Sequence, residues 1–445
     1  MKKFLPIISA FIVCLIALLP QAGYAQPGVL DTTFNPASAV FTQGVTTGTS
    51  FDKSVKQQDG KILISGVINN YNGVTINANN SSSANVIRIN ANGTLDESFN
   101  NNGLTEGLIL SIGALAVQAD GKIIIAGGFT GYDGVPGNGI MRLNTDGSVD
   151  NSFAVGTGFH LNSFNFFLQS ISIQSNGQII VSGNFDEYNG VSRKGIARLN
   201  TDGSLDNSFN PGASINFASG VPSIRNTVLQ SDGKIILSGF SVTNVGQNFT
   251  NYEILRVNTD GSVDNSFITP FPASTYHSFS KVFVQPDDKL VVFGGLPWGS
   301  GYATLSRLNA DGSIDNAFNA GYTSGYSNSI LDIKFQADGK IILAGSFDNY
   351  RYAPDVSGSA VPVPGKIIRL MPNGTIDPGF TAAPGVILAG GAGIVWFLEL
   401  QSNEKIITGI NDYLNDKSYV KRLNADGSLD STTAAGAIGG SIPNL

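Results

Sequence analysis

Residues 198–209 read RLNTDGSLDNSF, and nearly the same twelve letters return as RLNTDGSVDNSF from Arg142 and as RVNTDGSVDNSF from Arg256. With small variations, this arginine motif, R-x-N-x-D-G-S-x-D, occurs seven times in the 445-residue chain. Its copies begin at Arg88, Arg142, Arg198, Arg256, Arg307, Arg369 and Arg422. A pattern repeated this often indicates one structural unit that recurs along the chain.

A second pattern, Q-x-D-G-K followed by an apolar run, alternates strictly with the first. The turn residue of this glutamine motif falls at Asp59, Asp120, Asn176, Asp232, Asp287, Asp338 and Asn403. The two motifs repeat with a period between 51 and 65 residues. Periods of this length indicate stacked supersecondary units rather than independent domains.

Each unit contains four short segments with the pattern of β-strands and two tight turns. The run KIII at 122–125 is apolar on both faces of a strand, so its sheet must be covered on both sides. Four-stranded sheets packed face to face around an axis provide that cover. The sequence therefore predicts an all-β fold, a single seven-bladed β-propeller of four-stranded antiparallel blades over residues 26–434, followed by a short tail at 435–445.

The hairpin in the arginine motif has two candidate registers. A two-residue type I′ turn would place Leu199 opposite Asp206. A type I turn with Gly203 as a G1 bulge places Leu199 opposite Leu205, and Arg198 opposite Asp206. We favour the second register because it pairs apolar with apolar and cation with anion.

Seven cross-strand ion pairs follow from that register, each of which would set the register more than it would add stability. They are Arg88–Asp96, Arg142–Asp150, Arg198–Asp206, Arg256–Asp264, Arg307–Asp315, Arg369–Asp377 and Arg422–Asp430. The alternative is a calcium loop, because Asn200, Asp202, Ser204 and Asp206 alternate like the early ligands of such a loop. The glycine at position four and the missing bidentate Glu favour the structural turn, so we expect no metal and no cofactor.

Two glutamine motifs lack the turn glycine and carry Asp288 or Glu404 in its place. A left-handed conformation costs about 1 kcal/mol for such residues. We expect Glu404 to relax into a different turn, because its strand is also one residue shorter before Gly409.

An L-D-x-x-F element ends six units, but the seventh has Thr433 where Phe is expected. The segment LDTTF at residues 30–34 supplies an unattached copy. We expect the amino-terminal segment to pack beside the carboxy-terminal blade and close the ring, which removes an exposed edge. The alternative is that 429–434 forms the full outer strand and residues 26–36 merely cover it.

The chain begins with Lys2 and Lys3, a short apolar run and small residues up to Ala25, which is typical of a secretory signal peptide over residues 1–25. We expect export to the extracellular space, the cell surface or the periplasm, and no transmembrane segment. The only cysteine, Cys14, lies in this signal, which excludes disulfides and thiolate sites from the mature chain. The net charge of −7 argues against nucleic acid as a partner.

The stretch VQADGKIIIAGGFTGYDG, followed by GIMRLNTDGSVDNSF, closely resembles the delta-60 repeat of predicted bacterial β-propellers. The resemblance covers residues 28–434 and all seven copies. It implies a secreted or cell-surface protein, and it brings no established catalytic residues. The chain departs from the pattern in the insertion at 351–365 and in the irregular last unit.

Function should lie on the loops between the second and third strands, which emerge on one rim. These loops carry aromatic side chains suited to a protein or a glycan, and we predict that they contact a ligand: Tyr71, Tyr132, Tyr188, Trp298, Tyr302, Tyr350 and Tyr352. The alternative is that the tyrosines pack on their own loops. His160 and His277, the only histidines, fall in different units and predict no catalytic pair.

The sequence thus favours a monomeric, non-catalytic binding or scaffold module that engages a protein or glycan through one rim. The alternative is a glycan hydrolase or lyase with carboxylates in the central channel. An enzyme would need two carboxylates that converge without arginine partners.

Overall fold

In the computed structural model, every secondary-structure element of the described residues is a β-strand. The described residues are 50–71, 74–76, 83–100, 103–106, 111–161, 167–211, 215, 223–243, 250–269, 278–295, 303–319, 321–324, 329–352, 360–382, 393–412 and 417–430. No helix among them is long and apolar enough to cross a membrane. The predicted signal at 1–25 and the tail at 435–445 lie outside these residues.

One arrangement of three antiparallel strands recurs in every unit. In the first, β1 (Ser50–Lys56), β2 (Ile62–Val67) and β5 (Asn85–Ile89) are hydrogen-bonded in that order. The others are β7 (Ile112–Val117), β8 (Ile123–Gly127), β11 (Ile140–Leu143); β13 (Phe167–Ile173), β14 (Ile179–Asn184), β17 (Ile196–Leu199); β18 (Asn226–Leu229), β19 (Ile235–Thr243), β20 (Thr250–Val257); β21 (Ser278–Val284), β22 (Leu290–Gly295), β23 (Ala303–Leu308); β25 (Ile330–Phe335), β26 (Ile341–Gly345), β29 (Ile367–Leu370); and β30 (Gly393–Leu400), β31 (Ile406–Asp412), β32 (Lys417–Leu423). Where a fourth strand is expected, each unit forms a single bridged pair, such as Leu199 with Leu205.

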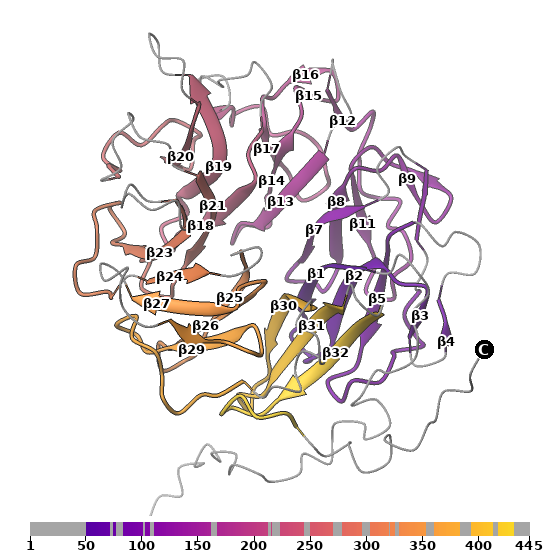
Figure 1. Cartoon of the computed structure of the whole chain (residues 1–445). Helices are drawn as coiled ribbons and strands as arrows, with labels where there is room; N and C mark the ends of the chain where they lie inside the picture. Colours follow the sequence, from indigo (N-terminus) through magenta and orange to yellow (C-terminus); the bar gives the residue numbers. More distant parts are fainter. Residues whose placement is uncertain are drawn as a thin grey trace, which may run out of the picture.

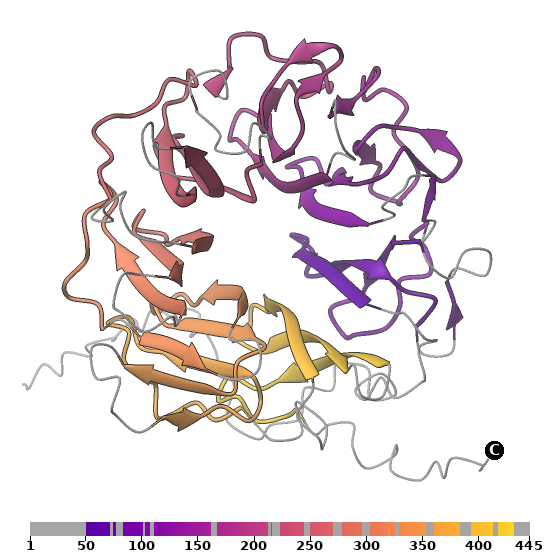
Figure 2. The ribbon, with the colours of Figure 1, turned by 45° about the horizontal axis from the view of Figure 1, so that its top comes forward.

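The sheets stand around a common centre, and the first strand of each lies nearest to it (Figure 1; Figure 2 shows the same arrangement tilted). Neighbouring first strands pack on one another, with β7 between β1 and β13, and β30 between β25 and β1. The second strands are buried on both faces, as the apolar run in β8 predicts, since all five of its residues are buried. These are features of a β-propeller.

Short outer strands tie neighbouring units together. They form β6 (Leu104–Glu106) with β9 (Gly131–Tyr132) and β10 (Val135–Pro136); β12 (Phe159–His160) with β15 (Glu187–Tyr188) and β16 (Val191–Ser192); and β24 (Gly321–Ser324) with β27 (Asn349–Tyr352) and β28 (Val361–Pro362). A further hairpin pairs β3 (Asn70–Tyr71) with β4 (Val74–Thr75). In each set, a segment leaving one unit pairs with a hairpin of the next, so hydrogen bonds join neighbouring units at these three places. The third set also continues the β21–β22–β23 sheet, because β24 pairs with β23.

The predicted hairpin register is confirmed. Leu199 bridges Leu205, and the Asp206 amide donates to the Arg198 carbonyl at 2.9 Å. Gly203 has φ +89°, a conformation that suits glycine, and its amide donates to Asn200 at 3.0 Å. The same bridge recurs in all seven units, so the arginine motif encodes this turn.

Each motif arginine lies beside the aspartate eight residues later, and the first six also donate a hydrogen bond to the next unit. Arg256 Nε lies 2.8 Å from Asp264 Oδ2, while its Nη1 donates to the Ala310 carbonyl of the following unit at 2.6 Å. The guanidinium carbon stands 4.8 Å from the centre of the Phe267 ring. Lys234 of the glutamine motif adds a contact of 3.0 Å to the same aspartate. One side chain thus joins two strands, a ring and the neighbouring sheet.

Five of the other six units repeat this arrangement. Nη1 reaches the next turn at Arg88–Thr145, Arg142–Thr201, Arg198–Thr259, Arg307–Pro372 and Arg369–Ala425. The seven arginines stand within 2.8 Å of their aspartates: Arg88–Asp96, Arg142–Asp150, Arg198–Asp206, Arg256–Asp264, Arg307–Asp315, Arg369–Asp377 and Arg422–Asp430. The repeated charges therefore belong to the frame.

The low pKa values of the motif aspartates predict that the protein loses stability in acid. Burial alone would raise the pKa of Asp206, but hydrogen bonds from Ser208 and Arg198 outweigh it and lower that pKa to about 2. The pKa is likewise held low at Asp96, Asp150, Asp264, Asp315 and Asp377.

A depressed folded pKa gives stability that is complete above the unfolded pKa near 3.9 and is lost as pH falls through the folded value. We therefore expect urea midpoints to fall steeply between about pH 4 and pH 2, with Asp206 contributing about 2 kcal/mol of that loss. In Asp206→Asn the slope with pH should be shallower. A slope identical to the wild type would refute the assignment.

Asp288 and Glu404, which replace the turn glycine in two glutamine motifs, both keep the turn of that motif. Asp288 has φ 62° and Glu404 has φ 64°, and the Glu404 amide still donates to Gln401 at 3.1 Å. The expectation that Glu404 adopts another turn is therefore wrong. The hydrogen bonds of the hairpin hold the residue in the left-handed region despite its Cβ.

We expect Glu404→Gly to raise the free energy of unfolding by about 1 kcal/mol, because glycine adopts this φ without strain. Asp288 is the matched contrast. Its carboxylate accepts the Ser231 amide at 2.7 Å and the Ser231 hydroxyl, which lie in the preceding unit. Asp288→Gly should therefore gain nothing in chemical denaturation. Equal gains for the two variants would contradict this explanation.

The first and last units contact one another directly. The Phe51 amide donates to Asn411 Oδ1 at 3.2 Å, and the Ser54 hydroxyl donates to Glu399 Oε1 at 2.7 Å. The Phe51 and Phe397 rings meet edge to face, 5.7 Å apart. The predicted closure by Phe34 and residues 26–36, with Thr433 at the other end, lies outside the described residues.

Candidate functional site

The first strand of the units carries a β-bulge at one fixed place. In β1 the register shifts between Phe51 and Lys53, so Asp52 is the extra residue. The same shift occurs in β7, β13, β21, β25 and β30. The bulged residue always stands five positions before the glutamine of the motif: Asp52, Gly113, Gln169, Ser280, Leu331 and Trp396, with Arg225 in the same position before β18.

At the bulge, the backbone of the first strand comes very close to the second strand, and a glycine of the second strand makes room for it. A Cβ on Gly345 would lie 1.9 Å from the Ser329 carbonyl oxygen, and one on Gly127 would lie 2.1 Å from that of Ser111. No side chain fits at such a distance, so the first strand can bulge only where glycine faces it.

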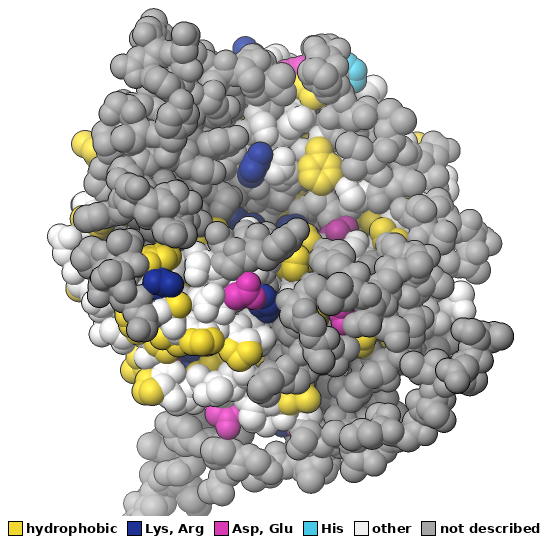
Figure 3. Space-filling model, in the orientation of Figure 1, with side chains coloured by type: hydrophobic (Ala, Val, Ile, Leu, Met, Phe, Trp, Pro, Cys, Tyr) yellow, Lys and Arg dark blue, Asp and Glu magenta, His cyan; other side chains and the backbone are white. Residues whose placement is uncertain are grey.

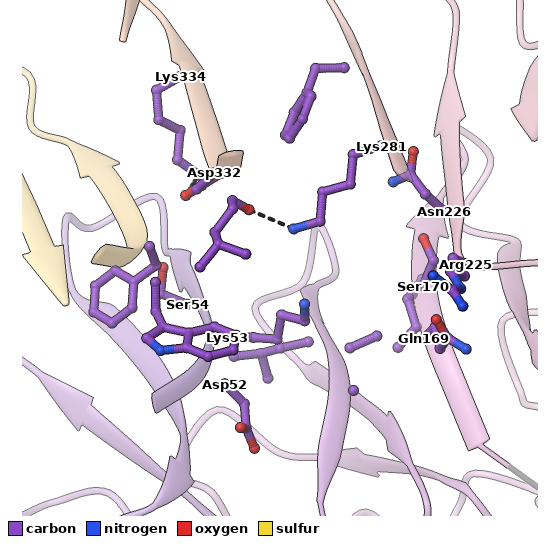
Figure 4. Close-up of a pocket in the computed structure, with 18 residues that line it drawn as sticks. Asp52, Lys53, Ser54, Gln169, Ser170, Arg225, Asn226, Lys281, Asp332 and Lys334 are labelled. Atoms are coloured by element: carbon purple, nitrogen blue, oxygen red, sulfur yellow. Dashed lines mark hydrogen bonds and ion pairs between the residues drawn. The ribbon is translucent and has the colours of Figure 1, made fainter. Parts of the chain in front are cut away.

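The bulged residues and those after them line a cavity of about 220 Å³ between the first strands. Figure 4 shows the labelled polar side chains entering it from several units. Six of the contributing residues come from six different units: Asp52, Gln169, Arg225, Lys281, Asp332 and Trp396. The cavity is therefore shared by the ring and belongs to no single repeat.

The cavity positions differ from unit to unit, although the surrounding sequence repeats. At the bulge the chain has Asp, Gly, Gln, Arg, Ser, Leu and Trp in turn. At the next position it has Lys53, Ala114, Ser170, Asn226, Lys281, Asp332 and Phe397. A structural need common to all units would select one residue type, so this variation marks the cavity as the candidate functional site.

One side of the cavity holds a neutralised group of charges. Asp332 accepts the amides of Leu398 at 2.8 Å and of Ile333 at 2.9 Å. Lys334 Nζ stands 3.6 Å from Asp332 and 3.5 Å from Glu399. Burial disfavours the charge of Lys334, but both carboxylates together outweigh it and raise its pKa. Burial raises the pKa of Glu399, against the opposing effect of Lys334, so this lysine and its carboxylates form one interacting group.

The other side has cations of a different kind. Burial lowers the pKa of Lys53, against the attraction of Asp52 and Asp332. Burial and then repulsion from Lys53 lower the pKa of Lys281 to about 8. Burial also raises the pKa of Asp52 to about 6, against the opposing effect of Lys53. Figure 3 shows basic and acidic side chains close together at the middle of this face.

Four of the tyrosines predicted as rim contacts are core side chains. Tyr71, Tyr132, Tyr188 and Tyr350 are at most 5% exposed. The Tyr71 hydroxyl donates to Gly93 at 2.8 Å, and that of Tyr188 donates to Gly203 at 2.7 Å. Their rings fill the space under the outer hairpins, so burial leaves no face for a ligand, and the packing alternative describes them.

The remaining predicted contacts divide into two groups. Tyr352 is 36% exposed, and its hydroxyl accepts the Ile376 amide, so it contacts its own unit. Trp298 and Tyr302 lie outside the described residues, as does much of the insertion at 351–365.

The oxygens of the arginine motif are engaged within their hairpins. Asp202 Oδ1 accepts the Ser204 amide at 2.9 Å and its hydroxyl at 2.7 Å. Asp206 Oδ1 likewise accepts the amide and hydroxyl of Ser208, while its Oδ2 contacts Arg198. Within the described ranges, no group of three histidine, cysteine or acidic residues is placed to hold a metal ion. Exposed His160 lies on β12, and His277 is outside the described residues.

Asp52, Lys53, Lys281 and Trp396 were not among the residues predicted to bind a ligand. A signal for them exists in the sequence, because they occupy two adjacent non-repeating positions at a constant distance from a repeating glutamine. The change of residue at these two positions, within units that otherwise repeat, marks the site in the sequence, and the aromatic residues of the loops do not.

Comparison with solved structures finds β-propellers at low sequence identity. A catalytically inactive virginiamycin B lyase from Staphylococcus aureus is 14% identical, with a TM-score of 0.48, over 85% of this chain and 96% of that one. The WD40 β-propeller domain of Doa1 is 12% identical, with a TM-score of 0.41, over 86% and 95%. A PL25 ulvan lyase is 10% identical, with a TM-score of 0.41, over 88% and 96%. No curated protein matches the chain.

One family model matches the chain in seven segments. The segments are 57–99, 118–153, 174–209, 230–267, 285–318, 336–380 and 413–432, and the family is described as a β-propeller domain of unknown function, DUF5122. Six of the matched segments run from the glutamine motif to the end of the arginine-motif hairpin, so the match rests on the residues that build the frame. The chain belongs to the DUF5122 β-propeller family.

Proposed function

We propose that the protein is an exported, non-catalytic binding module that takes the end of a glycan chain into the cavity at its centre. The frame is a closed seven-bladed wheel of the delta-60 type. The contacts between the first and last units support closure, and the pattern of residues 1–25 supports export.

The observation that carries the proposal is that seven repeating units place non-repeating side chains in one cavity. Trp396 supplies an aromatic surface, and Gln169, Ser54 and Asp52 supply hydrogen-bonding groups. Ligand sites typically combine apolar surface with a few convergent polar groups. The apolar face of a sugar ring and its hydroxyl groups match that combination.

The size of the cavity favours a glycan over a protein. About 220 Å³ is below the roughly 300–1,000 Å³ of pockets for drug-sized ligands. A stable protein–protein interface buries about 1,200–2,000 Å². The small ring at the end of a glycan chain needs only a cavity of this kind, whereas a protein partner would need the predicted rim loops, including Trp298 and 351–365, as its main surface.

Isothermal titration calorimetry with oligosaccharides selected on a glycan array tests this proposal. Gln169→Ala should weaken binding about tenfold, because it removes a polar group from the cavity without touching the core. Gln58→Ala, at an exposed turn position, is the control and should bind like the wild type. Trp396→Leu should also weaken binding, with its melting temperature measured beside it because Trp396 packs on the core.

Enzymatic cleavage is the second candidate, and one observation favours it. Asp52 and Lys281 line one cavity with pKa values near 6 and 8, which suits an acid and a base at neutral pH. A hydrolase or lyase would shorten the bound oligosaccharide, and Asp52→Asn would abolish the shortening while retaining affinity. Intact oligosaccharide after prolonged incubation would leave binding as the function.

A further inference from the structure

Two lysines face the same space in the cavity. Figure 4 shows Lys53 on β1 and Lys281 on β21 directing their side chains toward the middle. Lys281 Nζ donates to the Leu331 carbonyl at 2.5 Å, which occupies one of its three donors. Among the described residues, neither lysine forms an ion pair with a carboxylate within 4.0 Å, in contrast to Lys334.

We infer that Lys53 and Lys281 together bind an oxyanion of the ligand, so that the glycan taken into the cavity is an acidic one. This inference rests on the proposed function and specifies its ligand. A carboxylate or a sulfate ester presents several acceptor oxygens and can receive hydrogen bonds from both ammonium groups at once.

The surroundings make this pair a binding site rather than a structural contact. Two like charges that approach in a half-buried cavity repel one another, and nothing in the frame requires either of them, since other units have Ala114, Ser170 or Phe397 at the same position. An anion between them would relieve the repulsion. Asp332 attracts both lysines, but among the described residues it forms no ion pair with either within 4.0 Å, and it already accepts two backbone amides and stands beside Lys334.

Three oligosaccharides with the same ring and linkage test the inference, namely galactose, galacturonate and galactose 6-sulfate oligomers, because they differ only at the sixth carbon. In calorimetry with the mature protein, we expect at least one acidic oligomer to bind tenfold or more tightly than the neutral one. The carboxylate and sulfate arms show which oxyanion the cavity prefers.

The double variant Lys53→Gln/Lys281→Gln should bind all three oligomers alike, with the affinity that the wild type has for the neutral one. Glutamine keeps hydrogen-bonding capacity and removes only the charges. Lys194→Gln, at an exposed position outside the cavity, is the matched control and should keep the acidic preference.

The pH dependence gives a second readout. Because burial and the repulsion of Lys53 lower the pKa of Lys281 to about 8, the acidic preference should decline as pH rises from 7 to 9. The other charged groups around the cavity are Asp52, Arg225, Asp332, Lys334 and Glu399. Of these, Asp52 should strengthen anion binding when it becomes neutral below about pH 6.

The outcomes separate the two proposals. Equal wild-type affinity for neutral and acidic oligomers overturns the oxyanion site and leaves glycan binding in place. An acidic preference that survives in the double variant also overturns it, since the charge then acts elsewhere. Failure of every oligosaccharide to bind overturns the proposed function itself.

Discussion

Replacing Arg256 by methionine is expected to lower the free energy of unfolding by about 3–5 kcal/mol, the cost of breaking one partner out of a buried ion pair. Both side chains of the pair with Asp264 are only 8% exposed. The change also leaves the Ala310 carbonyl of the next unit without its 2.6 Å donor and removes the cation over Phe267. One substitution therefore weakens a hairpin and the junction between two units.

Lys234→Met is the matched control for Arg256→Met. Lys234 contacts the same carboxylate but is 30% exposed, so its removal should cost no more than about 1 kcal/mol. In the double variant Arg256→Met/Asp264→Leu, part of the lost stability should return, because no buried charge is left unpaired. Urea unfolding measures all four proteins. A cost below about 1 kcal/mol for Arg256→Met would contradict the role given to the arginines.

We expect Gly345→Ala to lower the free energy of unfolding by about 3 kcal/mol or more, which is the second large effect. The added Cβ would meet the Ser329 backbone oxygen at 1.9 Å, and backbone cannot rotate away as a side chain can. The bulge in β25 would have to open, which moves Leu331 and Asp332 at the cavity. We therefore expect lower stability together with weaker ligand binding in the fraction that folds.

Gly134→Ala is the control for the conformational cost of replacing a glycine where no neighbouring atom is close. Gly134 has φ +74° and nothing within 4 Å of the position of a Cβ. Its substitution should cost about 1 kcal/mol, from conformation alone, and leave binding unchanged. Equal losses for the two variants, measured by urea unfolding, would show that close approach at the bulge is not the reason for Gly345.

The frame was predictable because its determinants are local. The register of the 198–206 hairpin follows from one turn of nine residues, in which apolar must face apolar. Seven copies of that turn, alternating with the glutamine motif, then indicate stacked sheets. The Arg–Asp spacing could be read in the same way, because both residues lie in one hairpin.

The contacts between units could not be derived from that spacing. Whether Arg256 reaches Ala310 depends on the angle at which two sheets pack, and no residue within the hairpin sets it. The role of Phe267 as the ring beneath the guanidinium depends on the same packing. The motif identifies the arginine and its aspartate, but it does not show which neighbouring sheet the arginine contacts.

The rim hypothesis failed for four of the predicted tyrosines, which are buried, for a related reason. An aromatic residue beside Asn or Gly suits a ligand loop and a packed hairpin equally well, and only burial distinguishes them. Tyr188 is fully buried under its hairpin. Its recurrence with Tyr71 in the same YNG sequence was the available clue, because recurrence indicates a structural need.

The cavity depends on a bulge whose position is set by pairing between strands. Asp52 lines the cavity because it is the extra residue of β1, between Phe51, which pairs with Gly66, and Lys53, which pairs with Ser65. The sequence alone does not show that β1 has this extra residue. What the sequence does contain is the contrast between the repeating glutamine and the changing residue five positions before it. The repeating glutamine therefore marks the frame, and the changing residue five positions before it marks the candidate site.

Fluorescence of Trp396 tests most directly the claim that repeating residues build the frame and non-repeating ones bind the ligand. The chain has two tryptophans, so Trp298→Phe leaves Trp396 as the only reporter. Adding the acidic oligosaccharide should change its emission saturably, with the Kd found by calorimetry, and the Lys53→Gln/Lys281→Gln change should move the response to at least tenfold higher oligosaccharide concentrations. Calorimetric binding with unchanged Trp396 emission would place the ligand outside the cavity and contradict the claim.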